Sequence, residues 1–396
     1  MRIGMILDDV FPPDPRVENE AISLLNNGHK VFLFCLKYGS ESTSEVINKI
    51  QVRRYPSNTI EYKLSALAYT IPLYSFLMKL KINKFIQACQ IEVLHIHDMR
   101  IAQAVFNANR KFHLPVVLDL HENRPAIMKY YPHLKKAPGK YLISPKIWQI
   151  KEEKFIKRAD KIVVVTSQSK KEILSRVSID KRKITVLPNT IRKSFYENAI
   201  IQPQIIKQYF NHFSLLYIGD TGSRRGLITA IKSIKKLKSK IENIKLVIVG
   251  KMPKNSILLK LVEDLDLNSF VDFLGWKDPS QFSSYISSCD ICISPLHRNL
   301  HHDTTYANKL FQYMSFGKPL LVSDAIAQKE LVENTNSGIV HKEKNVSDFT
   351  EKVLELYRNK TLRTTLGKNG ERFVKEEFSW EKTSKDLIDM YKTISN

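Results

Sequence analysis

Short apolar runs alternate with amphipathic segments along most of this 396-residue chain. The first repeat joins the run RIGMIL, at 2–7, to a second run at 30–35. Between them, Asp14 and Pro15 favour the start of a helix, and Gly28 favours its end. Short continuous apolar runs are typical of buried parallel strands, and amphipathic segments of the helices that cover them. The pattern predicts a β-α-β unit, the opening of a doubly wound α/β domain.

The alternation continues through the first half of the chain and restarts after a less periodic stretch at 189–212. Strand-like runs lie at 93–97, 116–120, 161–165 and 184–188, and then at 214–219, 245–250, 271–275 and 290–295. We therefore expect two α/β domains, residues 1–200 and residues 201–376, followed by a helical segment at 377–396.

One apolar segment, residues 64–78, carries no charged side chain. It is shorter than the roughly 20 residues that span a bilayer, and Pro72 interrupts it. Lysines flank it at positions 63, 79, 81 and 84. Two interpretations remain open: a helix that lies in a membrane interface, and an internal helix that covers the sheet.

Lysine and arginine outnumber aspartate and glutamate by 62 to 40, so the formal net charge is +22. Such a balance indicates an anionic partner: nucleic acid, an acidic membrane surface or a phosphorylated substrate. The lysines are spread along predicted helices, which is typical of a solvated face and argues against nucleic-acid binding. The N-terminal apolar run is too short for a signal peptide, so we expect a cytoplasmic protein.

Two protein classes lose support from missing motifs. The first β-α-β unit has no G-x-G-x-x-G, which argues against a dinucleotide-dependent oxidoreductase. Cys289 and Cys292 form a single C-x-x-C with no second pair, so we expect the four cysteines to be core side chains rather than zinc ligands.

Polar residues follow two predicted strands of the first half. Asp98 comes after 93–97, and His121 and Glu122 come after 116–120. Ligands of open α/β sheets bind beyond the carboxyl ends of the strands, so these three residues are candidates for chemistry. A purely structural histidine is the alternative.

In the second half, Gly219 and Gly250 close two predicted strands and permit a sharp turn there. The loop that follows the first glycine leads into a predicted helix and carries Thr221, Gly222, Arg224 and Arg225. Helix N-termini prefer acidic side chains, so two arginines at this place indicate a bound anion such as a diphosphate. A basic helix start without a ligand is the alternative.

A second polar helix start lies within residues 301–324. Its polar side chains are Thr304, Thr305, Asn308, Lys309 and Gln312. Free amides at a helix start suit a phosphate-bearing ligand, whereas an ordinary surface helix needs no ligand.

Eight segments share their order and spacing with one enzyme family. They are FPPDPRV near the start, DLHE at 119–122, ADKIVVVT at 159–166, VLPN at 186–189, YIGDTGSRRGL at 217–227, VDFLGW at 271–276, NKLFQYMSFGKPLLVSD at 308–324 and FSW near the end. Over nearly its full length the chain resembles the retaining GT-B glycosyltransferases of family four (glycosyl transferases group 1). The resemblance implies two Rossmann-like domains facing across a cleft, with the C-terminal helix packing back on the N-terminal domain.

The resemblance also implies an activity. The N-terminal domain would bind the acceptor, and the C-terminal domain a nucleotide-diphosphate sugar, UDP- or GDP-linked. The enzyme would need no metal and no cofactor. It would move a hexose-type sugar to a saccharide or lipid-linked acceptor with retention of anomeric configuration, in surface polysaccharide or glycolipid synthesis. We expect it in the cytoplasm, with peripheral contact to the anionic inner face of the membrane as a further expectation.

Residue roles follow from the same resemblance. His121 would contact the transferred sugar, and Arg225, assisted by Arg224, would stabilise the leaving diphosphate. The remaining donor-binding candidates are Gly219, Thr221, Gly222, Gly250, Thr304, Thr305, Asn308, Lys309 and Gln312. The acceptor-side candidates are Arg16, Asp98 and Glu122. The histidines at 297, 301 and 302 lie on a predicted loop, and we expect no metal there.

Three departures from the family pattern keep two alternatives open. Asp220 stands where the family commonly has an arginine, and Thr304 and Gln312 stand at the positions of two glutamates. Gln312 still offers a donor and an acceptor to ribose hydroxyls, but no charge. Lys309 offers a replacement cation near the phosphates. The alternatives are a GT-B sugar-nucleotide 2-epimerase and a non-catalytic relative that binds nucleotide sugar.

Overall fold

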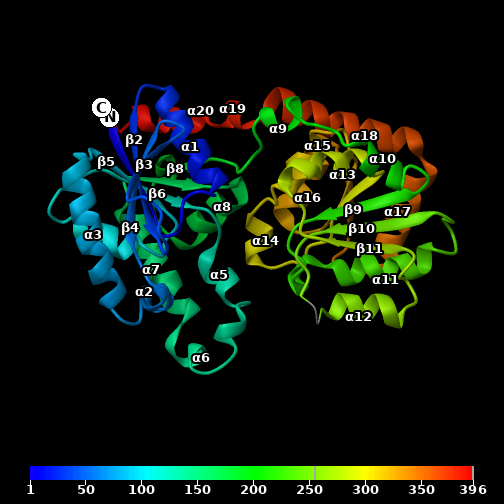
Figure 1. The fold of residues 1–396 in the computed structure, drawn as a ribbon, viewed down its shortest axis with the longest axis horizontal. Helices are drawn as coiled ribbons and strands as arrows, with labels where there is room; N and C mark the ends of the chain where they lie inside the picture. Colours follow the sequence, from blue (N-terminus) through cyan, green and yellow to red (C-terminus); the bar gives the residue numbers. More distant parts are fainter. Residues whose placement is uncertain (254–255, 395–396) are drawn as a thin grey trace. The chain divides into compact units, whose positions relative to one another are not determined.

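The computed structural model describes residues 1–253 and 256–394, which form two compact units (Figure 1). The first unit contains Met1–Pro188 together with the C-terminal segment that begins at Ser384, and the second contains Asn189–Thr383. The first unit therefore ends at Pro188 rather than at residue 200. The last helix belongs to the first unit although the rest of the second half intervenes in the sequence.

The first unit is built on an eight-stranded sheet with the order β3-β4-β2-β1-β5-β6-β7-β8. Its strands are β1 (Arg2–Leu7), β2 (Lys30–Lys37), β3 (Ser44–Ile47), β4 (Ile50–Pro56), β5 (Val93–His97), β6 (Val116–Leu120), β7 (Lys161–Val164) and β8 (Ile184–Val186). Every neighbouring pair is parallel except β3 and β4. The parallel sheet confirms the predicted doubly wound architecture.

The β3–β4 hairpin was not expected from the sequence. Its two-residue turn, Asn48–Lys49, has positive φ at both positions, as tight hairpin turns require. Such turns usually carry glycine, so Asn-Lys is a weak signal. β3 is also exposed and polar, and it lacks the apolar run that marks the other strands.

The first unit also contains α-helices. They are α1 (Pro15–Asn26), α2 (Thr59–Ser65), α3 (Leu73–Cys89), α4 (Ala102–Ala108), α5 (Arg124–Met128), α6 (Gly139–Leu142), α7 (Pro145–Arg158), α8 (Ser167–Arg176) and α20 (Lys385–Lys392). The Asp14 side chain accepts the backbone amides of Arg16 and Val17 and so caps α1, which confirms the predicted helix start. In α20, the Tyr391 hydroxyl lies 2.8 Å from His95 Nδ1, and both side chains are fully buried.

Residues 64–78 do not form one helix. α2 ends at Ser65 and α3 begins after Pro72, whose missing N–H suits a helix start and interrupts a helix interior. Tyr74 and Met78 are buried against the sheet, whereas Phe76 is 55% exposed. In residues 1–253 and 256–394, no helix combines the length and the apolar character needed to cross a bilayer.

The second unit contains a six-stranded, wholly parallel sheet with the order β11-β10-β9-β12-β13-β14. Its strands are β9 (Phe213–Ile218), β10 (Ile244–Val249), β11 (Val271–Gly275), β12 (Ile291–Ser294), β13 (Leu320–Ser323) and β14 (Gly338–His341). Its helices are α9 (Ser194–Glu197), α10 (Pro203–Tyr209), α11 (Leu227–Leu237), α12 (Ile257–Asp264), α13 (Phe282–Ser288), α14 (Leu300–Thr304), α15 (Lys309–Met314), α16 (Ile326–Thr335), α17 (Val346–Arg358), α18 (Lys360–Arg372) and α19 (Trp380–Thr383).

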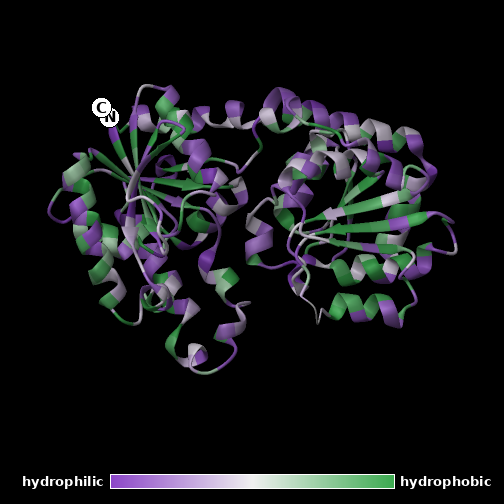
Figure 2. Ribbon diagram, viewed as in Figure 1, coloured by the Kyte–Doolittle hydropathy of each residue, from purple (hydrophilic) through white to green (hydrophobic). Residues whose placement is uncertain are grey.

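Two cores fill the opposite faces of this second sheet, and Figure 2 shows the hydrophobic strands between them. Ile231 of α11 and Val353 of α17 belong to one core, and Phe311 of α15 and Ile286 of α13 belong to the other. All four cysteines are free and buried, which confirms them as core side chains. The β-α alternation thus places the ends of β9 and β10 beside the start of α11 and α15.

Candidate active site

His121 follows β6 and is held by a buried carboxylate. Its Nε2 lies 2.9 Å from Asp119 Oδ2 and 3.2 Å from His97 Nδ1. Asp119 and His97 are completely or almost completely buried, while His121 keeps 22% of its side chain exposed. Within the described residues, His121 Nδ1 makes no hydrogen bond, so this nitrogen remains available to a ligand.

Arg16 is the buried cation that pairs with the Asp119 carboxylate. Its guanidinium donates to both oxygens of Asp119, at 3.0 and 2.8 Å, and to the Leu187 carbonyl, and it lies 3.0 Å from Glu20. Only 4% of Arg16 is exposed. The structure therefore places this acceptor-side candidate inside the unit, where it orients Asp119 rather than meeting an acceptor directly.

The electrostatics favour an ionised Asp119 and a charged His121. Burial opposes ionisation of Asp119, but Arg16 and His121 hold its pKa well below the usual value. Burial likewise opposes the charge on His121, but Asp119 raises the pKa of His121 above its usual value. His121 can therefore present a positive, hydrogen-bonding imidazole to a ligand near neutral pH.

Four ligand-type side chains come together beneath His121. In the part of the chain that the structure describes, Glu20, His95, His97 and Asp119 offer atoms within 4.8 Å of one another. The Arg16 guanidinium already lies against both carboxylates of this group. A cation there would face a buried arginine, so the donor set is better suited to holding Arg16 than a metal ion.

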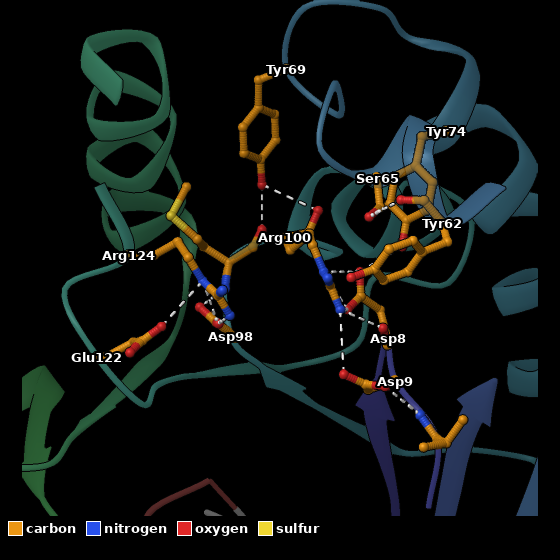
Figure 3. Close-up of polar contacts among 12 residues, drawn as sticks. Asp8, Asp9, Tyr62, Ser65, Tyr69, Tyr74, Asp98, Arg100, Glu122 and Arg124 are labelled. Carbon is orange, nitrogen blue, oxygen red and sulfur yellow. Dashed lines mark hydrogen bonds and ion pairs between the residues drawn. The ribbon is translucent and has the colours of Figure 1, made fainter. Parts of the chain in front are cut away.

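Two further candidates lie at the ends of the neighbouring strands. Asp98, directly after β5, accepts from Arg124 Nε at 2.9 Å and from the Met99 amide at 2.7 Å. Glu122 lies 3.6 Å from the same Arg124 Nε. Burial opposes ionisation of Asp98, but Arg124 and His121 lower its pKa below the usual value. Figure 3 shows both carboxylates directed at the Arg124 guanidinium.

A second arginine–carboxylate pair stands beside the first (Figure 3). Arg100 Nε donates to the two oxygens of Asp8 at 2.7 and 2.8 Å, and Arg100 Nη2 donates to the Asp8 carbonyl. The Tyr74 hydroxyl also donates to Asp8. Sequence reasoning missed Asp8, Arg100 and Arg124. The signal was present for Asp8, which directly follows β1 as Asp98 follows β5.

In the second unit, Lys309 is a buried cation at the start of α15. It is 9% exposed, and its Nζ lies 3.4 Å from the centroid of the Tyr217 ring. Within the described residues it forms no hydrogen bond and no ion pair. Burial and the nearby Arg225 hold the pKa of Lys309 well below its usual value. An unpaired buried ammonium is costly, and an anion placed beside it would remove that cost.

The glycines that close β9 and β10 keep the space beside Lys309 open. Gly219 has a φ of +135°, and a Cβ on it would lie 3.7 Å from Lys309 Nζ. A Cβ on Gly250 would lie 1.9 Å from the Gly219 carbonyl oxygen. Gly219 is thus favoured by its positive φ, as expected for a sharp turn, whereas Gly250 is required by the close approach of the Gly219 carbonyl.

The loop after Gly219 differs from the expected cationic cradle. Arg225 Nε donates to Asp220 Oδ2 at 3.0 Å, and Asp220 Oδ1 accepts the Gly222 amide. Burial opposes ionisation of Asp220, but Arg225 lowers its pKa below the usual value. Asp220 thus partly neutralises Arg225. Thr221, by contrast, donates its hydroxyl to the Lys251 carbonyl.

The polar residues before α15 are only partly available. Thr304 and Thr305 both donate their hydroxyls to the backbone of α14. The amides of Leu310 and Phe311 donate to the carbonyls of Ala307 and Asn308, so these two amides at the helix start are already used. The side-chain amide of Gln312 makes no hydrogen bond among residues 1–253 and 256–394 and remains able to meet a ligand.

The histidines that follow β12 are organised by hydrogen bonds. His302 Nδ1 lies 2.7 Å from the His297 carbonyl and 3.0 Å from Asn299 Nδ2. Burial lowers the pKa of His302 to about 4, so its ring is neutral at neutral pH. Arg224 contributes its carbonyl, which accepts the His297 amide at 2.9 Å and ties this segment to the loop before α11.

Family comparisons agree with the division of the chain into two units. Residues 16–195 match the model of Glycosyltransferase Family 4, and residues 202–373 match the model of Glycosyl transferases group 1. The two matches correspond to the first and second units and together cover most of the chain.

Individual relatives have low sequence identity to this chain, but they align with it over long stretches. An uncharacterised glycosyltransferase of Methanocaldococcus jannaschii is 24% identical over 84% of this chain and 83% of its own length. The capsular polysaccharide biosynthesis glycosyltransferase CapM of Staphylococcus aureus is 25% identical over 59% of this chain and 62% of its own. The structure of Anabaena HepE in complex with UDP-glucose aligns with a TM-score of 0.74 at 13% identity, over 99% of this chain and 100% of that one. The chain is a glycosyltransferase with the GT-B fold, in which a Glycosyltransferase Family 4 domain precedes a Glycosyl transferases group 1 domain.

Proposed function

We propose that this glycosyltransferase moves a hexose-type sugar from a nucleoside diphosphate to a saccharide or lipid-linked acceptor, with retention of anomeric configuration and without a metal ion. The observation that carries the proposal is Lys309, a buried lysine without an ionic partner among the described residues, beside the glycine-lined end of β9. A diphosphate supplies the anion that this lysine lacks.

Donor binding follows from the second unit. Lys309 and Arg225, with Arg224 nearby, meet the two phosphates, and Gly219 and Gly250 leave room for them. Gln312 offers its amide to the ribose hydroxyls. Thr221, Gly222, Thr304, Thr305 and Asn308 shape the surrounding loops, since most of their hydrogen bonds are used within the protein. HepE was solved with UDP-glucose, which supports a UDP-linked donor. A GDP-linked donor is the alternative, and the thermal unfolding experiment below includes it.

Transfer needs charge stabilisation at two places. When the bond between the sugar and the diphosphate breaks, negative charge grows on the phosphate, where Lys309 and Arg225 stabilise it. Positive charge grows on the sugar, and His121 orients the sugar through a hydrogen bond rather than abstracting a proton. Asp119 fixes the orientation of His121 through the 2.9 Å contact with Nε2.

Thermal unfolding in the presence of UDP-, GDP-, ADP- and CMP-sugars tests the donor directly. A ligand that binds only the folded protein raises its free energy of unfolding in proportion to the logarithm of ligand concentration over Kd. At a ligand concentration of a hundred times Kd the increase is about 2.7 kcal/mol. We expect one nucleotide class to raise the Tm and Lys309→Met to abolish the shift. A Tm shift that survives in Lys309→Met would exclude the phosphate role of Lys309.

Two other functions remain as competitors because Asp220, Thr304 and Gln312 depart from the family pattern. A GT-B sugar-nucleotide 2-epimerase would change the donor without any acceptor. A non-catalytic relative would bind the donor and release it unchanged. Product analysis after incubation with donor alone, and then with donor and acceptor, separates these activities. An Arg225→Ala variant with unchanged turnover would remove Arg225 from the mechanism.

We further propose that the protein acts in the cytoplasm at the inner face of an anionic membrane, in surface polysaccharide or glycolipid synthesis. CapM, a capsular polysaccharide biosynthesis enzyme, supports the pathway class. A cavity of about 470 Å³ beside α3 supports the membrane contact. Its described lining includes Lys79, Arg110 and Lys151 and no carboxylate, and the exposed side chains of Ile71 and Phe76 adjoin it.

A further inference from the structure

The cavity of about 470 Å³ beside α3 lies in a part of the chain without acidic side chains. Residues of α3, α4 and α7 line it, and its volume falls within the roughly 300–1,000 Å³ of small-molecule binding sites. The lining comes from within residues 62–91, 99–118 and 123–151, and none of these three stretches contains an aspartate or a glutamate. A ligand that enters the cavity therefore meets positive charge that no carboxylate of its described lining offsets.

Three cations line the cavity: Lys79 on α3, Arg110 shortly after α4, and Lys151 on α7. Lys79 and Arg110 form no ion pair and no hydrogen bond with any residue that the structure describes. Lys151 Nζ lies 3.4 Å from Gln103 Oε1, which leaves its other N–H groups available. Burial and the neighbouring Arg110 lower the pKa of Arg158, so the cations here repel one another. A bound anion would relieve that repulsion.

A buried hydroxyl completes the polar side of the cavity. Ser75 on α3 is 4% exposed, and its hydroxyl makes no hydrogen bond within residues 1–253 and 256–394. Asn107 Oδ1 accepts from Gln103 Nε2 at 3.0 Å, whereas the Asn107 amide nitrogen donates to no described residue. The Thr70 hydroxyl is not available, because it donates to the Leu142 carbonyl at 2.6 Å. A buried hydroxyl without a partner is uncommon in a closed interior and indicates a position that a ligand completes.

This set of donors suits a phosphomonoester better than other common anions. A phosphomonoester carries a charge of about −1.5 to −2 and three strong acceptor oxygens. The oxygens point in three directions, so they can accept from several walls of a cavity at once. A carboxylate has one charge and two oxygens in one plane, and a phosphodiester has one charge. Donors that come from α3, α4 and α7 therefore match the monoester in both charge and geometry.

Two of the helices that line the cavity also carry exposed apolar side chains (Figure 1). On α3, Leu73, Phe76 and Leu80 are spaced by three and four residues, which places them on one face of the helix. Phe76 itself lines the cavity. On α7, Ile147 and Ile150 are three residues apart and are also exposed. A cationic cavity bordered by apolar side chains fits a ligand that carries both a phosphate and a hydrocarbon chain.

We propose that this cavity is a discrete site for the phosphomonoester headgroup of an anionic lipid. Lys79, Arg110 and Lys151 bind the phosphate oxygens together with the Ser75 hydroxyl, and the exposed apolar side chains of α3 and α7 contact the acyl chains. The inference rests on the proposed membrane contact and goes beyond it. Attraction to an anionic surface requires only net charge, whereas this site binds a single lipid per chain and selects its headgroup.

Isothermal titration calorimetry on the full chain tests the site with short-chain lipids kept below their critical micelle concentration. The probes are dihexanoyl phosphatidic acid, dihexanoyl phosphatidylglycerol and glycerol 3-phosphate. We expect the phosphatidic acid to bind as a single molecule per chain. The phosphatidylglycerol should bind at least about tenfold more weakly, because its diester carries less charge. Glycerol 3-phosphate should also bind at least about tenfold more weakly, because it has no acyl chain to bury.

A substitution that leaves the net charge unchanged separates a discrete site from diffuse attraction. Ser75→Ala removes only the buried hydroxyl and should weaken phosphatidic acid by about tenfold, the effect of losing one hydrogen bond to a charged group. Ser175→Ala on α8 is its control, since Ser175 is exposed and does not line the cavity. Lys79→Met should weaken binding by about tenfold more than Lys84→Met, which removes the same charge from α3 outside the cavity. Circular dichroism checks that each variant is folded.

The outcomes separate this inference from the proposed function. Unchanged affinity in Ser75→Ala, equal losses in Lys79→Met and Lys84→Met, or equal affinity for monoester and diester would each overturn the discrete site. Equal affinity for glycerol 3-phosphate would overturn the lipid as the source of the phosphate group. Flotation with phosphatidylglycerol vesicles is measured on the same samples. If flotation persists while the site fails, the proposed membrane contact stands; if flotation is absent, that contact fails whatever the soluble probes do.

Discussion

Asp220 changes what Arg225 can offer a phosphate. Where the family commonly has a second cation, this chain has a carboxylate that accepts from Arg225 Nε at 3.0 Å. The pair is partly exposed, so its own contribution to stability is small. Its effect on a ligand is larger, because a diphosphate approaching Arg225 also approaches Asp220.

Replacing Asp220 by asparagine should therefore strengthen UDP binding. A half-exposed charge pair is worth about 0.2–1 kcal/mol, so we expect an increase in affinity of up to about fivefold. Isothermal titration calorimetry with UDP measures it. Asp266→Asn is the control, since Asp266 is 95% exposed in the same unit. Weaker binding by Asp220→Asn would show instead that Asp220 contacts the nucleotide.

Lys309 predicts a pH dependence of donor binding. Burial and Arg225 hold its pKa well below the usual lysine value of about 10.4. A bound diphosphate favours the charged ammonium, so binding takes up a proton once the pH exceeds the free-protein pKa of Lys309. UDP affinity should then fall as the pH rises through that pKa, by at most about tenfold per pH unit.

Calorimetry in buffers with different ionisation enthalpies counts this proton. We expect proton uptake in the wild type, a smaller uptake in Lys309→Met, and wild-type uptake in Lys260→Met on α12. In the unliganded protein the sign is opposite, because the folded state binds fewer protons than the unfolded chain, so stability rises with pH across the same interval. Equal uptake by Lys309→Met and the wild type would contradict the assignment.

At the scale of elements, the C-terminal helix makes a buried polar contact with the sheet of the first unit, besides the packing of its apolar side chains. In α20, the Tyr391 hydroxyl lies 2.8 Å from His95 Nδ1, and burial keeps the pKa of His95 well below its usual value. His95 is therefore neutral at neutral pH. Its ring also stacks on His97, which touches His121, so the helix is connected to the candidate site through two rings.

Tyr391→Phe should lower the free energy of unfolding of the first unit by about 1–3 kcal/mol, because it leaves a buried histidine nitrogen without its partner. Urea titration followed by circular dichroism measures the change. Tyr141→Phe, at an exposed position, should leave the transition where it is. A Tyr391→Phe midpoint equal to that of the wild type would show that packing alone holds α20.

Secondary structure was predictable where a single element carries its own signal. Asp14 caps α1 by the expected hydrogen bonds, and Pro72 explains why the apolar segment 64–78 breaks before α3. The hairpin β3–β4 was missed because its turn, Asn48–Lys49, lacks glycine. Which polar side chains are free to bind a ligand was predicted less well. Thr304 and Thr305 were candidates, but both donate their hydroxyls to backbone carbonyls.

At the scale of the whole molecule, the side chains that give the net charge of +22 lie in two kinds of surroundings. Many lysines are exposed on helices such as α11, whereas Lys79, Arg110 and Lys151 gather around one cavity that has no carboxylate in its described lining. Exposed Ile71 and Phe76 lie at the same place. A cationic cavity with apolar neighbours is suited to anionic lipid headgroups.

The variant Lys79→Glu/Arg110→Glu/Lys151→Glu should reduce binding to phosphatidylglycerol vesicles by roughly a hundredfold, since each cation near an anionic surface contributes about 1 kcal/mol. Vesicle flotation at low salt measures it, with phosphatidylcholine vesicles as the neutral reference. The control Lys232→Glu/Lys235→Glu/Lys236→Glu makes the same change in net charge on α11. An equal loss in the control would assign the effect to total charge and not to this cavity.

The sequence by itself determined the alternation of strands and helices and several of the residues at which they begin or end. Apolar runs, helix caps and the glycines after β9 and β10 are local features, and local features are encoded by neighbouring residues. The family motifs also identified His121, Arg225 and Lys309 as candidate site residues. Tertiary structure decided how those side chains are used: it buried Arg16 under Asp119, paired Asp220 with Arg225, and set Arg100 and Arg124 against Asp8 and Asp98. Apart from Asp220 and Arg225, which lie in one loop, those pairings join residues of opposite charge that are distant in the sequence, so no local pattern predicts them.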